Sequence, residues 1–572
     1  MPKYPKKKLA QLVLQECVER GIEHVIISPG SRNAPLTLGF VNHPKINALS
    51  IVDERCAAFF ALGMAQQLRE PVVLLCTSGS ALLNYYPAIA EAYYSKIPLI
   101  VISADRPKHL IDIGDGQTIR QEGVFKNHIL FEANIEDEMG ESFDDPESPE
   151  FLMNGRLVLE ALTCAQEKMG PVHINIPFDE PLYETVASIF PMPKIHHQDK
   201  KLLSGSLLME EPIPVDELQK FADLWNGASK KMVVLGSNFP DELIRIQLSH
   251  LAKDPSVLIF TETTSNVAND RFINNIDQLI FPLSQQELEE LKPDILLTFG
   301  GMVVSKKVKE FLRKYRPKLH WHVDAHRAFD TYHCLSHHFA ISAQLFFSQF
   351  FFLTKHGSSP YQAQWVDVKN QRKIRHREFL DQVDYSDILV FDKVLKSIPK
   401  YSNVQLANSS VIRYSQLFDL DATLKIFCNR GTSGIDGSTS TAIGAACAQQ
   451  ERTVFITGDI SFFYDSNALW NKYIPMNFRI VLINNGGGGI FRFIPGPKAS
   501  DALDFFETTH DLNASSLCKM FGFSYTSANN KQALNKALQT FYEDAEKPKL
   551  LEIFTPTERN DEFLKAYFNA LT

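Results

Sequence analysis

Short runs of apolar residues recur along the chain, and helix-like segments lie between them. The runs are apolar throughout rather than alternating with polar residues, which predicts parallel strands covered by helices on both faces. Several of these runs end at a Gly, Ser or Pro turn. They fall into three successive groups, at residues 25–27, 72–75, 99–102 and 172–176, then 232–235, 257–260, 295–299 and 319–323, then 454–456 and 480–483.

This grouping predicts an α/β protein with three successive domains, each built on an open, mostly parallel sheet. A chain of 572 residues is too long for one hydrophobic core and fits about three domains of ordinary size. Two polar stretches with prolines and little periodicity separate the groups. We therefore predict domains at 1–185, 214–353 and 371–572, joined by linkers at 186–213 and 354–370.

Composition and charge narrow the functional classes. The formal net charge of −9 and the absence of a basic stripe argue against a nucleic-acid partner. No apolar run approaches the length of a membrane span, and the start of the chain does not resemble a signal peptide, so we expect a cytoplasmic protein. The 8 cysteines form no Cys-x-x-Cys pair, which favours reduced thiols over disulfides or a zinc ribbon.

Polar residues that could hold a magnesium diphosphate follow two strands of the third group. Asp459 comes after one apolar run and Asn485 after the next, with a helix-like segment at 467–473 between them. Carboxyl ends of parallel strands share one edge of a sheet, and Mg²⁺ prefers oxygen ligands. The glycines at 486–489 would let backbone amides approach phosphate oxygens. A turn aspartate beside an unrelated glycine-rich loop remains an alternative.

Four further blocks accompany this motif, at residues 28–36, 53–55, 104–107 and 429–437. Together with the Gly-Asp and Asn-Asn pairs they resemble the thiamine-diphosphate-dependent decarboxylases and carboligases. Within that superfamily, they resemble most the carboligase branch of menaquinone biosynthesis. The resemblance runs nearly end to end. It implies a pyrimidine-binding, a central and a diphosphate-binding domain, with thiamine diphosphate and Mg²⁺, or alternatively Mn²⁺, as cofactors.

The resemblance also implies roles for particular residues. Glu54 matches the family's catalytic glutamate, although by itself it fits a first-turn charge of a helix. Asp459 and Asn485 would bind the metal through side chains and Gly487 through its carbonyl; a slightly short spacing keeps Asn484 as an alternative. The whole cofactor set would be Glu54, Ile435, Gly458, Asp459, Ser461, Asn485, Gly487, Ile490 and Phe491.

The substrates of that branch carry several carboxylates, for which arginine is the best partner. The resemblance implies decarboxylation of 2-oxoglutarate and addition of the resulting succinyl-semialdehyde carbanion to isochorismate. Ser409, Arg413 and Arg430 would face the succinyl part, and Ile490, Phe491 and Ile494 would form an apolar wall. The isochorismate side would comprise Ser31, Arg32, Arg106, Gln117 and Lys306. Gly116 departs from the asparagine common in the family. The resemblance further implies a homodimer or dimer of dimers with active sites at the subunit interface.

Other hypotheses remain open at this point. The chain could be another carboligase of the superfamily, such as an acetolactate-forming enzyme, or a catalytically silent scaffold of the same fold. Intact Glu54, Asp459 and Asn485 argue against a scaffold. A rival metal site is the cluster His322, His326, His333, Cys334, His337 and His338, in which His333 and His337 are spaced for one helix face.

Overall fold

The computed structural model describes residues 3–138, 144–192, 210–493, 496 and 500–572. The chain forms two compact units. The first unit contains residues 1–209, 431–450 and 464–475, and the second contains residues 210–430, 451–463 and 476–572. Most of the predicted linker at 186–213 lies outside the described residues.

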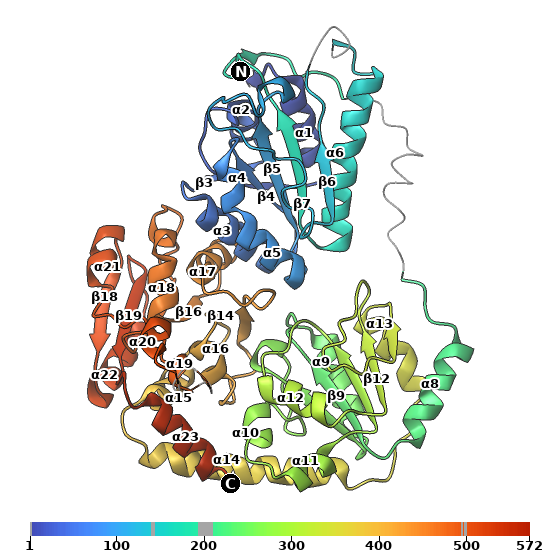
Figure 1. The fold of residues 1–572 in the computed structure, drawn as a ribbon, viewed down its shortest axis with the longest axis vertical. Coiled ribbons are helices and arrows are strands. Elements are labelled where there is room, and N and C mark those ends of the chain that lie inside the picture. The colour runs from blue at the N-terminus through green and yellow to red at the C-terminus, as the bar shows by residue number, and fades with distance from the viewer. Residues whose placement is uncertain (1–2, 139–143, 193–209, 494–495, 497–499) are drawn as a thin grey trace. The chain divides into compact units, whose positions relative to one another are not determined.

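The first unit is built on a parallel sheet with strand order β3-β2-β4-β5-β7-β6 (Figure 1). Its strands are β2 (His24–Ile27), β3 (Asn47–Ser50), β4 (Val72–Cys76), β5 (Leu99–Asp105), β6 (Phe131–Asn134) and β7 (Val172–Pro177). Short strands β1 (Tyr4–Pro5) and β8 (Thr185–Val186) form an antiparallel pair. The helices are α1 (Lys8–Glu19), α2 (Ala34–Asn42), α3 (Glu54–Leu68), α4 (Ser80–Asn84), α5 (Tyr86–Ser95), α6 (Pro149–Lys168) and α17 (Ser438–Cys447).

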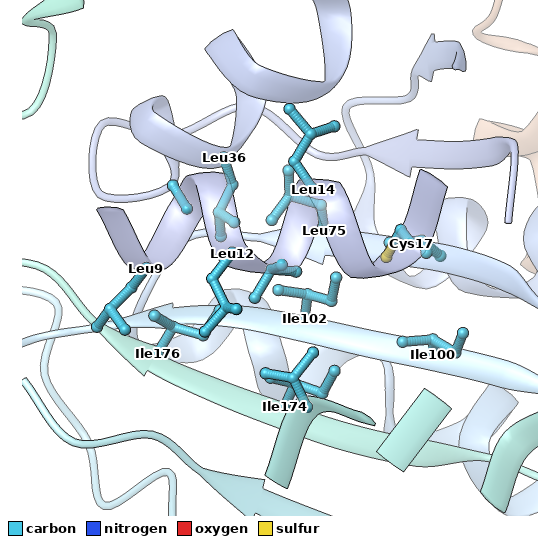
Figure 2. Close-up of a cluster of buried hydrophobic side chains, with 14 of the residues drawn as sticks. Leu9, Leu12, Leu14, Cys17, Leu36, Leu75, Ile100, Ile102, Ile174 and Ile176 are labelled. Carbon is cyan, nitrogen blue, oxygen red and sulfur yellow. The ribbon is translucent and has the colours of Figure 1, made fainter. Parts of the chain in front are cut away.

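Apolar side chains of α1 pack directly on this sheet. Figure 2 shows Leu9 and Leu12 over Ile102 and Ile176, and all of them are fully buried. Burying a side chain of this size contributes about 1.5–3 kcal/mol relative to leaving it in water. The sheet therefore provides a rigid base for the loops that follow its strands.

The second unit contains the other two parallel sheets. The central sheet has the order β10-β9-β11-β12-β13, with β9 (Lys231–Leu235), β10 (Val257–Thr261), β11 (Ile295–Phe299), β12 (Leu319–Val323) and β13 (His337–Phe339). Its helices are α8 (Val215–Gly227), α9 (Glu242–Leu251), α10 (Ile276–Ile280), α11 (Gln285–Leu291), α12 (Lys306–Lys314) and α13 (Ala343–Phe350). The long helix α14 (Tyr361–Gln382) begins inside the range predicted as a linker at 354–370.

The third sheet has the order β15-β14-β16-β17-β19-β18, with β14 (Asn403–Leu406), β15 (Lys425–Cys428), β16 (Thr453–Gly458), β17 (Arg479–Asn484), β18 (Ser524–Ala528) and β19 (Lys549–Phe554). Its helices are α15 (Asp387–Ser397), α16 (Ser410–Ser415), α18 (Asp459–Tyr464), α19 (Ile490–Phe493), α20 (Leu503–Glu507), α21 (Ser515–Phe521), α22 (Lys531–Phe541) and α23 (Asn560–Ala570). Three successive open parallel sheets confirm the predicted fold class. The exact domain boundaries stay a prediction.

The central sheet shows why its strands are apolar throughout. Val233 and Leu235 of β9 belong to one buried cluster, whereas Met232 and Val234 belong to another. Successive residues of a strand point to opposite faces, so both faces of the sheet are buried. Among the described residues, no helix is long and apolar enough to cross a membrane. The cellular compartment stays a prediction.

One prediction of local structure is wrong. Residues 467–473 do not form the helix between β16 and β17; α18 begins at Asp459, and a 3-10 turn covers Ser466–Leu469. Asn471 explains the difference, because its side chain bonds the carbonyl of Ala468 at 2.8 Å and the N–H of Tyr473 at 2.9 Å. Such local side-chain bonds compete with helix formation.

The alternative metal site at the histidine cluster is not supported by the structure. His337 lies in strand β13, paired with Trp321, and His333 has a left-handed backbone with φ of 58°. The two rings therefore do not share a helix face. Within the part of the chain that the structure describes, no three His, Cys, Asp or Glu side chains are grouped to hold a metal ion, so this rival site has no structural support.

Helices α3 and α17 pack so closely that glycine is required between them. A Cβ at Gly444 would lie 1.9 Å from the carbonyl oxygen of Phe60, and one at Gly63 would lie 2.0 Å from that of Thr441. Both contacts are backbone atoms that cannot rotate away. This pair of helices holds the start of α3 and the loop before α17 in one unit.

We expect Gly444→Ala to destabilise the first unit, because overpacking a tight contact typically costs about 1–3 kcal/mol. Gly227→Ala is the matched control, since it is also a helical glycine but a Cβ there meets nothing within 4 Å. Thermal unfolding of both variants measures the difference. Equal unfolding temperatures for the two variants would contradict the close packing.

Candidate active site

Asp459 and the glycine-rich loop meet at the carboxyl edge of the third sheet. Strands β16 and β17 are parallel neighbours, with Gly458 opposite Ile483. The carboxylate of Asp459 accepts hydrogen bonds from the N–H of Gly487 at 2.9 Å and of Ile460 at 2.7 Å. The structure thus brings these predicted residues together, in the second unit.

The loop conformation depends on glycine at two positions. Gly486 has φ of +75° and Gly487 has φ of +151°, which side chains disfavour. A Cβ at Gly487 would also lie 2.8 Å from the carbonyl oxygen of Glu507. A larger residue there would therefore move the loop away from Asp459.

The structure favours Asn485 over Asn484 as the residue facing a ligand. Asn484 ends β17, and its side chain is already used: Nδ2 donates to Glu552 at 2.7 Å and to the carbonyl of Leu512 at 2.9 Å. Its Oδ1 accepts from the N–H of Gly486 at 3.1 Å. Asn484 therefore fixes the loop, whereas Asn485 is available for binding.

Asp387 orients Asn485. It begins α15 and is buried, and its carboxylate accepts from Asn485 Nδ2 at 3.2 Å and from Thr555 Oγ1 at 2.6 Å. Burial raises the pKa of Asp387 to about 6. Because the amide nitrogen of Asn485 faces Asp387, its oxygen is left for another partner. Sequence reasoning missed Asp387; an acid directly before the apolar run 388–391 was the available signal.

His510 is a second residue that the sequence did not reveal. Its Nε2 lies 3.4 Å from the carboxylate of Asp459, close enough for an ion pair when the ring is protonated. Burial raises the pKa of Asp459, while its backbone hydrogen bonds and His510 oppose that shift. The chain around His510 has no recognisable motif, so only the fold places it here.

The donor atoms gathered at this edge suit a hard divalent cation. Asp459 offers a carboxylate oxygen, Asn485 a carboxamide oxygen and Gly487 a backbone carbonyl. Oxygen ligands of this kind are typical of Mg²⁺ and Mn²⁺ rather than of zinc. The residues present therefore fit the predicted metal, whose binding stays a proposal.

A cavity of about 390 Å³ opens beside this loop in the second unit. Asn485 and Ile490 line it, together with two predicted substrate residues, Lys306 and Arg413. Phe281 and Phe568 add apolar surface, and their rings stack at 4.1 Å between centroids. The cavity thus combines a charged side with an apolar wall.

Charged side chains of both signs line this cavity, namely Lys306, Lys307, Arg413 and Lys565 and the acids Asp277, Glu310, Asp387 and Asp561. Burial and the nearby charge of Arg430 lower the pKa of Arg413. Burial also lowers the pKa of Lys309, which is close enough to Lys306 and Arg430 for their charges to lower it further. Buried Glu262 and half-buried Asp277 lie among these groups, and within the cluster of Lys306, Lys309, Arg413 and Arg430 the cations outnumber these two acids. The second unit therefore offers a site for anions.

Arg430 and Ser409 are held by the ends of β14 and β15. Asn408 is buried; its Oδ1 accepts from Arg430 Nη1 at 2.7 Å, and its Nδ2 donates to the carbonyl of Asn429 at 2.8 Å. Ser409 has φ of +67°, an uncommon conformation for a non-glycine residue. Strain of this kind often marks functional sites. Asn408 was not identified from the sequence.

The first unit holds its own pair of arginines. Buried Arg32 donates to the carbonyl of Phe178 at 2.8 Å, and Arg106 donates to that of Gly116 at 3.0 Å. Burial and then the charge of Arg106 lower the pKa of Arg32, so the two guanidinium groups are near each other. Gly116 therefore contacts Arg106 through its backbone carbonyl, which an asparagine at this position would offer as well.

Two other predicted residues of this group, Ser31 and Gln117, are exposed. Gln117 has φ of +55°, and its backbone lies 3.1 Å from where a Cβ of Gly79 would stand. The loop carrying Gln117 is thus pressed against the loop that follows β4. Ser31, Arg32, Arg106 and Gln117 all follow strands of the same sheet.

Glu54 begins α3 and is half-buried. Its carboxylate accepts from Asn84 Nδ2 at 3.4 Å, and its charge, after burial, raises the pKa of the Cys76 thiol. Asp53 caps the helix by accepting from the N–H of Cys56 at 3.1 Å. The cap fixes the position of Glu54.

Ile435 lies in the loop before α17, in the same unit as Glu54. Buried Glu91 holds the beginning of this loop by accepting from the N–H groups of Gly431 at 2.7 Å and Thr432 at 2.6 Å. Asp465 then joins the two helices, since it accepts from the N–H of Ser440 at 2.7 Å and lies 3.6 Å from Arg55. The first turns of α3 and α17 are therefore adjacent.

The remaining predicted residues are placed as follows. Gly458 ends β16, and Ser461 is buried in α18. Phe491 lies in α19, with its ring 5.4 Å from that of Phe506. Ile494 lies outside the described residues.

Comparison with known proteins defines the class. Residues 7–129 match the family model "Thiamine pyrophosphate enzyme, N-terminal TPP binding domain", and residues 409–553 match "Thiamine pyrophosphate enzyme, C-terminal TPP binding domain". The first match contains Glu54 and the second contains Asp459 and Asn485. The chain is thus a thiamine pyrophosphate enzyme.

Full-length relatives give the particular family. The chain is 50% identical over 571 residues to the 2-succinyl-5-enolpyruvyl-6-hydroxy-3-cyclohexene-1-carboxylate synthase of Flavobacterium johnsoniae, covering 100% of both chains. It is 52% identical to the synthase of the same name from Christiangramia forsetii, covering 99% of both chains. It is 36% identical to the synthase of that name from Porphyromonas gingivalis, covering 100% of this chain and 98% of the relative. The chain belongs to the family of these synthases. This finding favours the predicted resemblance over an acetolactate-forming enzyme.

Proposed function

We propose that this enzyme decarboxylates 2-oxoglutarate and joins the succinyl unit to isochorismate, giving 2-succinyl-5-enolpyruvyl-6-hydroxy-3-cyclohexene-1-carboxylate for menaquinone biosynthesis. The single observation that carries the proposal is the cluster of the cations Arg413, Arg430 and Lys306 beside the oxygen donors of the 485–487 loop. The two substrates together present four carboxylates, which such a cluster can neutralise. The names of the full-length relatives support the same reaction.

Thiamine diphosphate, when bound, supplies the nucleophilic carbon and the electron sink for this chemistry. Asp459, Asn485 and Gly487 would hold its diphosphate through Mg²⁺ or Mn²⁺. Glu54 would hydrogen-bond the pyrimidine ring and hold a proton at its nitrogen. Ile435 would support the cofactor from below, and Ile490 and Phe491 would keep water from the reacting carbon.

The substrates would be positioned by the charged residues. Ser409, Arg413 and Arg430 would hold the carboxylate at the far end of 2-oxoglutarate. Isochorismate would contact Lys306 together with Ser31, Arg32, Arg106 and Gln117. No side-chain nucleophile is needed, because the chain's contribution is orientation, charge neutralisation and one held proton.

The proposed reaction has a direct test. Purified enzyme with thiamine diphosphate, Mg²⁺, 2-oxoglutarate and isochorismate should release carbon dioxide and form a product whose mass equals the sum of the substrates minus carbon dioxide. Mass spectrometry detects that product. Omitting isochorismate should prevent its formation, and a complete mixture without product would refute the proposal and favour a silent scaffold.

The two groups of arginines should differ in the substrate they affect. Arg413→Ala should raise the KM for 2-oxoglutarate, whereas Arg106→Ala should raise that for isochorismate. Losing a buried charged partner typically costs about 2–5 kcal/mol, which corresponds to at least tenfold in affinity. Steady-state titration of each substrate measures the effect. Equal effects on both substrates in both variants would contradict the assignment.

We also propose that the active enzyme is a homodimer, or a dimer of dimers, with Glu54 of one chain serving the metal site of the other. Mixing inactive Glu54→Gln chains with inactive Asp459→Ala chains should then restore activity. With random exchange about a quarter of wild-type activity should return, because half of the dimers are hybrids with one intact site each. Tagged co-purification verifies exchange; hybrids without activity would mean that each site lies within one chain.

A further inference from the structure

Buried Glu262 binds the backbone at the start of helix α12. It follows β10 at the carboxyl edge of the central sheet and is only 3% exposed. Its Oε2 accepts from the N–H of Val304 and its Oε1 from the N–H of Ser305, both at 2.7 Å. One carboxylate therefore holds two consecutive N–H groups at the positive end of a helix.

The next residue along the chain is Lys306, the first residue of α12. It lines the cavity together with Arg413 and Ile490. Ser305 caps the helix by accepting from the N–H of Val308 at 3.1 Å, and its hydroxyl donates to Asp277. The backbone that Glu262 holds therefore determines the point from which the Lys306 side chain leaves the helix.

We propose that Glu262 is a positioning residue for Lys306, and that it sets the affinity for the substrate anion that Lys306 contacts. The inference rests on the proposed function, in which that anion is isochorismate. Glu262 itself is absent from the residues that line the cavity, so it acts through the backbone of 304–305 and not by touching substrate.

The charges around Glu262 make its hydrogen bonds to the backbone of 304–305 sensitive to pH. Burial raises the pKa of Glu262 to about 7; the hydrogen bonds from Val304 and Ser305 oppose the shift, and Asp277 adds to it. Arg430 after β15 favours the ionised form, and Lys309 of α12 and Tyr332 also lie near this carboxylate. When the acid is protonated, its hydroxyl oxygen becomes a poor acceptor for the second N–H.

The KM for isochorismate should therefore rise as the pH falls from about 8 to about 6. Carboxylates with ordinary pKa values near 4 stay ionised across this range. The KM for 2-oxoglutarate should change much less. The free energy of unfolding should show the opposite trend. Because folding raises the pKa of Glu262, this residue favours the folded state at low pH, and its contribution is lost as the pH rises through about 7.

The variant Glu262→Gln tests the proposal, because glutamine keeps the shape but offers one acceptor oxygen. At pH about 8 its KM for isochorismate should be about tenfold above wild type, with kcat changed much less. The variant should also lose the pH dependence of that KM. In a Lys306→Ala background, adding Glu262→Gln should cause little further loss, since contacting residues that act as a unit are not additive.

Asp254→Asn is the matched control. Asp254 precedes β10 at the opposite end of the strand, is equally buried, and accepts from Lys231 Nζ at 3.0 Å. Its replacement should lower the unfolding temperature and leave both KM values unchanged. If Asp254→Asn raises the KM for isochorismate as Glu262→Gln does, general loss of stability explains the effect and the proposal is overturned.

A readout without substrate separates this inference from the proposed function. Hydrogen exchange of the peptide containing Val304 and Ser305 should be faster in Glu262→Gln than in wild type. Unchanged exchange, or full additivity with Lys306→Ala, overturns the positioning role. Absence of product with the wild-type enzyme overturns the proposed function instead, and exchange then still decides whether Glu262 holds this backbone.

Discussion

Buried carboxylates that accept backbone N–H groups determine how the loops of this enzyme are held. Glu91, Glu262 and Asp459 each bind two N–H groups of a loop or helix start. A hydrogen bond to a charged group contributes about 1.5–3 kcal/mol net. Burying an unpaired carboxylate would cost several kcal/mol, so each acid is stable only while its loop keeps this conformation. The loops and the acids thus depend on each other.

The parallel sheets explain why these loops carry the functional residues. In each sheet the strands run the same way, so every loop at the carboxyl edge opens on the same side. Asp459 and Asn485 follow neighbouring strands of the third sheet, and Ser409 and Arg430 follow two strands at its edge. Lys306 reaches the same cavity from the central sheet, because it follows β11. Residues far apart in sequence thereby meet without special long connections.

Much of this could be predicted from the sequence, because the informative features are local. Apolar strands identify the sheets, and the positions of Asp459 and Asn485 after two of them predict the sheet edge at which Asp459 meets the glycine-rich loop. The supporting residues could not be predicted: Asp387, Asn408 and His510 occur without a motif and acquire partners only through tertiary contacts. The same limit explains the wrong helix at 467–473, where Asn471 and contacts such as that of Asn467 with Asp53 replace helical bonds. The local sequence pattern thus identifies the candidate ligands, but not the residues that orient them.

The cations beside the cavity are also held close together by the fold. The protein carries a net charge of −9, yet the second unit groups the cations Lys306, Lys309, Arg413 and Arg430 close together. Burial alone would lower the pKa of Arg413 and Lys309, and the close cations lower it further. Glu262, close to Arg430, and Asp277, close to Arg413, reduce this repulsion, and each also bonds the start of α12. Binding of an anionic substrate would relieve the repulsion that remains among these cations.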